Sequence, residues 1–322
     1  MATKTGICIL CQQEKELNLE HVPPQGVGNK GGKNTLTGDL RDFISWNSSS
    51  EPLPREIKRQ PKGNAYYTLC IDCNSKLGGA YVKHYVDFAK ENKEFLYRIK
   101  NVKLGNNSKL THSMKDVNSL RVAKEIVAMF FSVNGEVDSK DVKFLDSVRT
   151  YLKEVENNNF PIEKYKIVLN YHFPIFAPWM KELHLATDMI DNESTHNYIR
   201  PFVKHELGNG QKIRYSEIQY EGIGLTLIDL ENSNYDITIG YDLKNFLTAQ
   251  DKSKKILLSN VPVFTPNSTL LMEKALEFPE ESGADLLLRE QRILNYIKSL
   301  NQKEREEAEL KIRALGKNRS IK

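Results

Sequence analysis

The 322-residue sequence lacks any long hydrophobic run. Its longest apolar stretches, such as 126–133, fall far short of the roughly 20 residues that a membrane-spanning helix requires. The first residues, MATKTGICILC, lack the apolar core of a signal peptide. Apolar residues make up 39% of the chain and charged residues 27%, a composition that argues against wholesale disorder. We therefore expect a folded cytoplasmic protein that has no membrane partner.

Positive charge is concentrated in the first third of the chain. Residues 1–109 hold 17 lysines and arginines against 11 acidic residues, a net charge of +6. Residues 110–322 hold the remaining 29 against 31, a net charge of −2. A surface for polyanions is therefore expected in 1–109, although a charge of +6 is also ordinary for a segment of this length.

The sequence has only four cysteines, and all of them lie in two Cys-x-x-Cys pairs, Cys8 with Cys11 and Cys70 with Cys73. This spacing lets two thiolates approach one ion at about 2.3 Å, and two such pairs complete a tetrahedral site, usually for zinc. A disulfide or a redox pair is the alternative, but disulfides are disfavoured inside cells and no βαβ pattern surrounds either pair. We predict a structural Zn²⁺ site. It would close the base of the turn-rich segment of 58 residues between the two pairs.

Two short motifs accompany the cysteine pairs. Glu20 and His21 begin the sequence Glu-His-Val-Pro-Pro, and Asn74 directly follows Cys73. In this order the chain resembles the HNH endonuclease superfamily, in the bacterial variant written C-x-x-C … E-H-x-P-P … C-x-x-C-N. The resemblance implies a ββα-metal core in which His21 is the general base, while Glu20 and Asn74 hold a catalytic divalent ion, Mg²⁺ or Mn²⁺. Gly78 stands where many members have a second histidine.

These residue types suit the hydrolysis of a phosphodiester bond. A neutral imidazole, with an ordinary pKa of about 6.5, accepts a proton from an attacking water at physiological pH. Carboxylate and amide oxygens are hard ligands for Mg²⁺ or Mn²⁺, which stabilise charge on the leaving oxygen. Glu20 and His21 need a strand end or a bulge to serve one site, and the prolines that follow favour a strand end. The ordinary alternatives are a surface Glu-His pair and an Asn that caps a helix.

Basic residues flank the second cysteine pair and are candidates for contacts with phosphates. Lys58, Arg59 and Lys62 precede it, and Lys76, Lys83, Lys90 and Lys93 follow it. A helix that begins near Asn74 would bring the lysines at seven-residue spacing to one face, and such contacts give salt-dependent binding without sequence readout.

The Gly78–Gly79 pair predicts a tight turn or a helix break. The expected partner is nucleic acid, with double-stranded DNA favoured over RNA.

Helical and strand patterns follow in the rest of the chain. Apolar residues recur at helical spacing from Val117 to Phe131 and from Val142 to Val155, and strand-like runs cover 165–171, 213–218, 224–230 and 235–241. The predicted fold class is α+β. It comprises a zinc-stapled, HNH-like domain over 1–109, an α+β domain for recognition or partner binding over 110–279, and a charged helical tail over 280–322. A homodimer or a protein partner would form through 110–322.

The combined prediction is a metal-dependent, HNH-type endonuclease. Proteins that resemble this one often belong to bacterial anti-phage defence, which is the expected setting by analogy alone. The alternative is a non-catalytic, zinc-stabilised module that binds nucleic acid or a protein. Gly78 favours the module, and the Glu20–His21 pair opposes it. The nuclease requires zinc and a second, exchangeable divalent ion, whereas the module requires only zinc.

Overall fold

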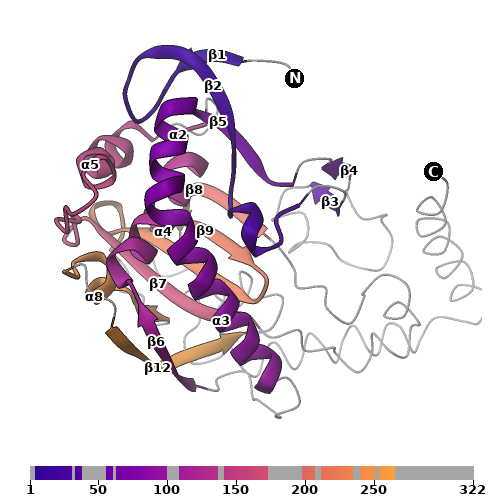
Figure 1. Cartoon of the computed structure of the whole chain (residues 1–322), viewed down its shortest axis with the longest axis vertical. Helices are drawn as coiled ribbons and strands as arrows, with labels where there is room; N and C mark the ends of the chain where they lie inside the picture. The colour runs from indigo at the N-terminus through magenta and orange to yellow at the C-terminus, as the bar shows by residue number, and fades with distance from the viewer. Residues whose placement is uncertain are drawn as a thin grey trace, which may run out of the picture. The chain divides into compact units, whose positions relative to one another are not determined.

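The structure is a computed structural model of the chain (Figure 1). It describes residues 4–30, 33–37, 56–60, 63–99, 109–136, 141–172, 198–206, 212–234, 240–250 and 254–264. Helices and mainly antiparallel sheets make up a mixed α+β fold, so the predicted fold class is confirmed at this level. The predicted charged tail over 280–322 lies outside the described residues.

Most of the described residues belong to one compact unit. This unit comprises residues 1–34, 59–173 and 196–264, and a second unit comprises 35–58, 174–195 and 265–322. A two-stranded sheet of β3 (Lys33–Thr37) and β4 (Glu56–Gln60) includes the described residues of the second unit. The domain boundaries proposed at 109/110 and 279/280 stay predictions.

A three-stranded antiparallel sheet carries the first cysteine pair and the Glu-His motif. Its strands lie in the order β1 (Lys4–Ile7), β2 (Glu14–His21) and β5 (Ala65–Cys70). β2 ends at His21, as the prolines predicted, and its pairing with β5 contains a bulge between Asn18 and Glu20. β5 leads through Cys70 into α2 (Ile71–Leu77), so two paired strands are followed directly by a helix.

The helix that follows the second cysteine pair runs on through its two glycines. α2 continues into a π-helical segment, η2 (Gly78–Val82), and then into α3 (Lys83–Ile99). The turn or break predicted at Gly78–Gly79 is therefore wrong, because a wider helical turn accommodates the pair without ending the helix. The wider turn also changes the phase between Lys76 and Lys83, so seven-residue spacing alone does not keep them on one face.

The second sheet has seven strands. Its order is β6 (Lys109–Val117), β12 (Lys254–Phe264), β7 (Tyr165–His172), β10 (Ile223–Asp229), β9 (Lys212–Tyr220) and β8 (Tyr198–Glu206), and β11 (Tyr241–Asp242) pairs with β7. Neighbouring strands are antiparallel except β12 and β7, which are parallel. The strands predicted at 165–171, 213–218 and 224–230 are confirmed. Most of the run at 235–241 lies outside the described residues.

One helix forms the centre of the core. In α4 (Ser119–Val133), 13 of the 15 residues are buried, as expected for a helix that is apolar on most of its circumference. α4 contacts α3, α5 (Val142–Lys153), α8 (Lys244–Leu247) and strands of both sheets. Both helices predicted from Val117 and from Val142 are confirmed. In the described part of the chain, no helix combines the length and the apolar character needed to span a bilayer.

Candidate metal centre and hydrolytic site

The four cysteines lie together, as their spacing predicted. All four Sγ atoms lie within 4.8 Å of one another, and the Sγ atoms of Cys11 and Cys70 are 3.9 Å apart. Four sulfur ligands at about 2.3 Å from one tetrahedral zinc ion would be about 3.8 Å apart, whereas a disulfide requires about 2.05 Å. The cysteines are free thiols, and the set of four fits one metal ion better than it fits a disulfide.

Backbone hydrogen bonds shape the cluster. The N–H of Cys8 donates to the carbonyl of Gln13 at 2.9 Å, and the N–H of Gln12, with φ 62°, donates to the carbonyl of Cys8 at 2.8 Å. The N–H of Ile9 donates to the carbonyl of Thr68 at 3.0 Å, which ties this turn to β5. Burial raises the pKa of the thiols of Cys8 and Cys73, and a bound cation would reverse this effect by favouring thiolates.

His21 lies at the end of β2 and is half-buried. It pairs in register with Ala65 of β5, and its Nε2 lies 2.9 Å from the amide nitrogen of Gln25. Gln25 begins η1 (Gln25–Val27). The Gln25 amide nitrogen can only donate, so Nε2 is the acceptor and its lone pair is engaged in this contact. A general base at Nε2 requires that the Gln25 amide move away from it.

Asn29 fixes the loop that follows His21. Its buried amide donates to the carbonyls of Pro23 at 2.6 Å and Asn64 at 2.8 Å, and its oxygen accepts from the N–H of Asn64 at 2.9 Å. Asn64 directly precedes Ala65, the residue of β5 that pairs with His21. The hydrogen bonds of Asn29 therefore hold the end of β2 and the start of β5 together. Sequence reasoning missed Gln25 and Asn29, because single amides in a loop carry no pattern.

Glu20 is held toward α4. Its Oε2 accepts hydrogen bonds from the hydroxyl groups of Ser132 and, at 3.4 Å, of Thr68. Burial raises the pKa of Glu20 to about 7. Burial also raises the pKa of Glu125, on α4, to about 8, and the nearby charge of Glu20 adds to the shift. Glu20 and His21 therefore have separate partners, as expected for neighbours on a strand.

Asn74, Lys76 and Lys83 lie on the continuous helical segment that begins directly after Cys70 and includes Cys73. α2, which carries Asn74 and Lys76, contacts β2, and Lys15 of β2 pairs with Asp72 of α2 at 3.1 Å. Lys76 and Lys83 are exposed, and Lys83 pairs with Asp87 at 2.5 Å. The side chains of Lys58 and Arg59, on β4, and all of Lys62 lie outside the described residues.

Comparison with known proteins adds no family or relative. No protein-family model matches the chain, and neither the curated proteins nor the solved structures include a match to it. The motif resemblance therefore depends on the residues of this chain alone.

Proposed function

We propose that the protein is a metal-dependent, HNH-type endonuclease that hydrolyses phosphodiester bonds of nucleic acid, with double-stranded DNA as the favoured substrate. One observation carries the proposal. The strand that ends in Glu20–His21 pairs with the strand that runs through Cys70 into the helix of Asn74, and the four-cysteine cluster joins the two. Two antiparallel strands followed by a helix are the elements that a ββα-metal core needs.

His21 acts as the general base and takes the proton of the attacking water. Its half-exposed position at a strand end supports this role. The amide of Gln25, 2.9 Å from Nε2, holds the ring in place and moves away when that nitrogen takes a proton from water. Asn29 supports it indirectly, since its hydrogen bonds fix the loop that carries the chain from His21 to Gln25. Gln25 and Asn29 are therefore positioning residues, and His21 is the group that contacts the substrate.

Glu20 and Asn74 hold the exchangeable divalent ion, Mg²⁺ or Mn²⁺. Both hydroxyl groups near Glu20 donate to Oε2, and Oε1 accepts no hydrogen bond from the described residues, so Oε1 is the oxygen available to an ion. Carboxylate ligands are commonly oriented by hydrogen bonds of this kind. When bound, the ion supplies electrostatic stabilisation of the leaving oxygen. The ion held by Cys8, Cys11, Cys70 and Cys73 is Zn²⁺ with a structural role.

Basic side chains around this site contact the phosphates of the substrate. The proposed contacts are Lys58, Arg59, Lys62, Lys76 and Lys83, and the exposure of Lys76 and Lys83 suits this role. One site cuts one strand, so double-strand cleavage requires two nicks or two subunits. Anti-phage defence in the bacterial cytoplasm is the setting proposed by analogy.

A non-catalytic, zinc-stabilised binding module is the second candidate. Two observations favour it: Gly78 occupies the position of the second histidine, and the pKa of Glu20 is raised to about 7. A carboxyl group that is partly neutral near pH 7 is a weaker ligand than one that is fully ionised. The two candidates differ in whether they need a second divalent ion.

Nicking of supercoiled plasmid by the zinc-loaded protein tests the proposal. We expect nicked circles when Mg²⁺ or Mn²⁺ is added and none when no second ion is present. Asn74→Ala should slow nicking by about 10-fold or more, because it removes an ion ligand. Asn159→Ala, at an exposed asparagine after α5, is the matched control and should leave the rate unchanged. Absence of nicking with either ion, while DNA still binds, would favour the binding module.

A further inference from the structure

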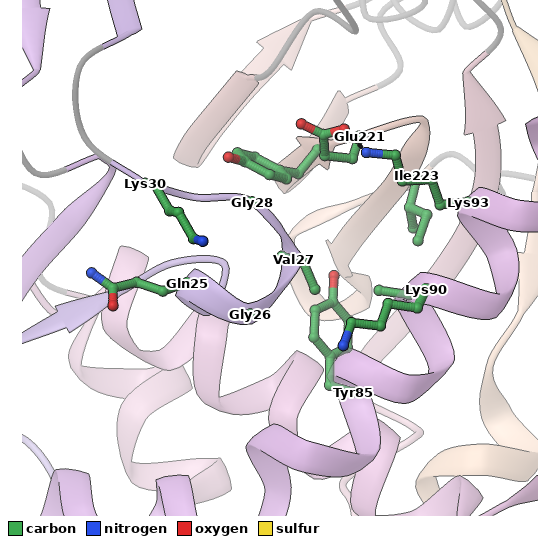
Figure 2. A pocket seen from close by; sticks show the side chains of 12 residues that line it. Gln25, Gly26, Val27, Gly28, Lys30, Tyr85, Lys90, Lys93, Glu221 and Ile223 are labelled. Carbon is green, nitrogen blue, oxygen red and sulfur yellow. Dashed lines mark hydrogen bonds and ion pairs between the residues drawn. The ribbon is translucent and has the colours of Figure 1, made fainter. Parts of the chain in front are cut away.

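A cavity of about 310 Å³ lies among three segments that are far apart in the sequence (Figure 2). Its walls are the η1 segment and the loop after it, with Gln25 and Lys30, then α3, with Lys90 and Lys93, and the turn between β9 and β10, with Glu221. This volume is at the lower end of the range for small-ligand sites. Lys90 and Lys93 were predicted as phosphate contacts on one helix face, whereas Gln25, Lys30 and Glu221 were not predicted to join them.

The cavity and the proposed hydrolytic site share a residue. Gln25 lines the cavity and is also the partner of His21 at 2.9 Å. The η1 segment packs tightly on α3, since a Cβ atom at Gly26 would lie 2.8 Å from Cγ2 of Val86 and 3.2 Å from its Cγ1. This packing fixes the position of the cavity relative to His21.

The lining carries excess positive charge. Lys93 pairs with Glu221 at 2.8 Å, which neutralises one of the three lysines. Lys30 and Lys90 are exposed, and neither forms an ion pair within the part of the chain that the structure describes. Figure 2 shows that they enter from opposite walls, one from the loop after η1 and the other from α3. Two ammonium groups directed at one small cavity favour an anion.

The turn that forms the third wall has an unusual residue in its first position. Glu221 has φ 50° and Gly222 has φ 86°, the left-handed pair typical of a tight hairpin turn. Asn, Asp or Gly adopts the first of these conformations at lower cost than Glu. The sequence thus keeps a carboxylate at a strained position, where it partners Lys93.

We propose that this cavity binds a phosphate group of the nucleic-acid strand that is cut at His21, with Lys30 and Lys90 as its cations. Glu221 limits the positive charge of the cavity, because it forms an ion pair with Lys93. The identity of the anion rests on the proposed function, whereas the cationic character of the cavity does not. A free nucleoside monophosphate has the same phosphate chemistry, so the experiment distinguishes the two sources.

Binding is measured by fluorescence anisotropy with a labelled DNA duplex and zinc-loaded His21→Ala protein, which separates affinity from cleavage. Added to this background, the pair Lys30→Gln and Lys90→Gln should weaken binding about 10-fold at 0.1 M salt and reduce the slope of log K against log salt by about two. The control pair is Lys143→Gln and Lys153→Gln. These substitutions replace two exposed lysines of α5 and remove the same amount of charge. Equal affinities and slopes in the two double variants would overturn the proposal.

Competition with a nucleoside monophosphate identifies the source of the phosphate. Monophosphate binding that needs Lys30 and Lys90, together with duplex binding that does not, would overturn the assignment to the nucleic-acid strand. Nicking by the protein with His21 intact is scored separately. If the protein with His21 intact nicks plasmid, but the cavity variant binds duplex with unchanged affinity, the phosphate site is refuted and the nuclease is not. If the cavity variant loses affinity, but the protein with His21 intact does not nick, the phosphate site is supported and the nuclease is refuted.

Discussion

The two main sheets of the protein are stabilised in different ways. In the three-stranded sheet, β1 has no buried residue and β2 has one, whereas all seven residues of β10 in the second sheet are buried. Apolar burial therefore stabilises the second sheet, and α4 covers it with a helix that is buried almost throughout. The small sheet has few buried residues beyond the three at the end of β5, and it carries the cysteine cluster instead. Chelation and core truncation should thus affect different parts of the chain.

Loss of the metal should have the largest effect. Structural zinc sites contribute about 10 kcal/mol or more of binding free energy, so Cys73→Ser or a strong chelator should unfold the small sheet and α2. Hydrogen exchange should then rise across 4–30 and 63–77 while 212–229 remains protected. Ser75→Ala, an exposed neighbour on α2, is the control. Unchanged protection of 4–30 after the metal is removed would contradict the comparison.

Truncation of the α4 core should have the next largest effect. Phe130 is fully buried, so Phe130→Ala should lower the free energy of unfolding by about 3–5 kcal/mol through the cavity it leaves. Urea denaturation of the zinc-loaded protein measures this loss. Val142→Ala removes an apolar side chain that is 54% exposed and should change the midpoint little. Equal losses in the two variants would show that α4 is not the centre of the core.

The junction between the two regions depends on Gly135. A Cβ atom there would lie 2.8 Å from the carbonyl oxygen of Phe131 and 2.5 Å from Cδ1 of Ile9, in the turn between Cys8 and Cys11. Gly135→Ala should therefore cost about 1–3 kcal/mol and weaken metal binding. At Gly79 an added Cβ atom would have no other atom within 4 Å, so Gly79→Ala should be neutral or slightly stabilising. Thermal melting with a zinc titration compares them, and a neutral Gly135→Ala would show that the two regions do not pack closely here.

Acid should destabilise the second sheet through His112, which lies on β6. Burial, assisted by the positive charge of Arg98, lowers the pKa of this histidine to about 4 from its ordinary value of 6.5. Between these values the unfolded chain binds the proton more readily, so the stability contributed above pH 6.5 is lost as the pH falls toward 4. His112→Phe keeps a ring stacked on Phe95, whose centroid lies 4.0 Å away, and removes the titration.

Urea denaturation of the two proteins from pH 4 to 7 checks this prediction. The stability of the wild type relative to His112→Phe should fall by about 3 kcal/mol over this range. Loss of zinc at low pH affects both proteins alike and does not enter the difference. A constant difference across the range would mean that His112 is not held neutral.

Much of this arrangement was predictable from local patterns. The Cys-x-x-Cys spacing predicted the cluster, the prolines after Val22 predicted the end of β2, and the apolar periodicity predicted α4 and α5. β6, β8 and β12 were not predicted, because their stability comes from partners distant in sequence rather than from a pattern within each strand. The lysine-lined cavity was not predictable for the same reason. Its walls come from η1, α3 and the β9–β10 turn.

The residues of the candidate site stay a prediction from motif order, and their contacts could not be predicted from the sequence. Chain order identified Glu20, His21 and Asn74, because motif spacing is visible in a sequence. The hydrogen bonds of Glu20 with Ser132 and of His21 with Gln25 depend on packing and strand ends, which no local pattern records. The π-helical segment at Gly78 was also unexpected, since glycine pairs are far more common in turns.

The rate of plasmid nicking by zinc-loaded His21→Ala, measured beside the wild type in Mg²⁺, tests the central claim most directly. His84→Ala, at the other histidine near the second cysteine pair, is the matched control. The account predicts a loss of about 100-fold or more in His21→Ala, the usual contribution of a general base, and little change in His84→Ala. Nicking at the wild-type rate by His21→Ala would contradict it.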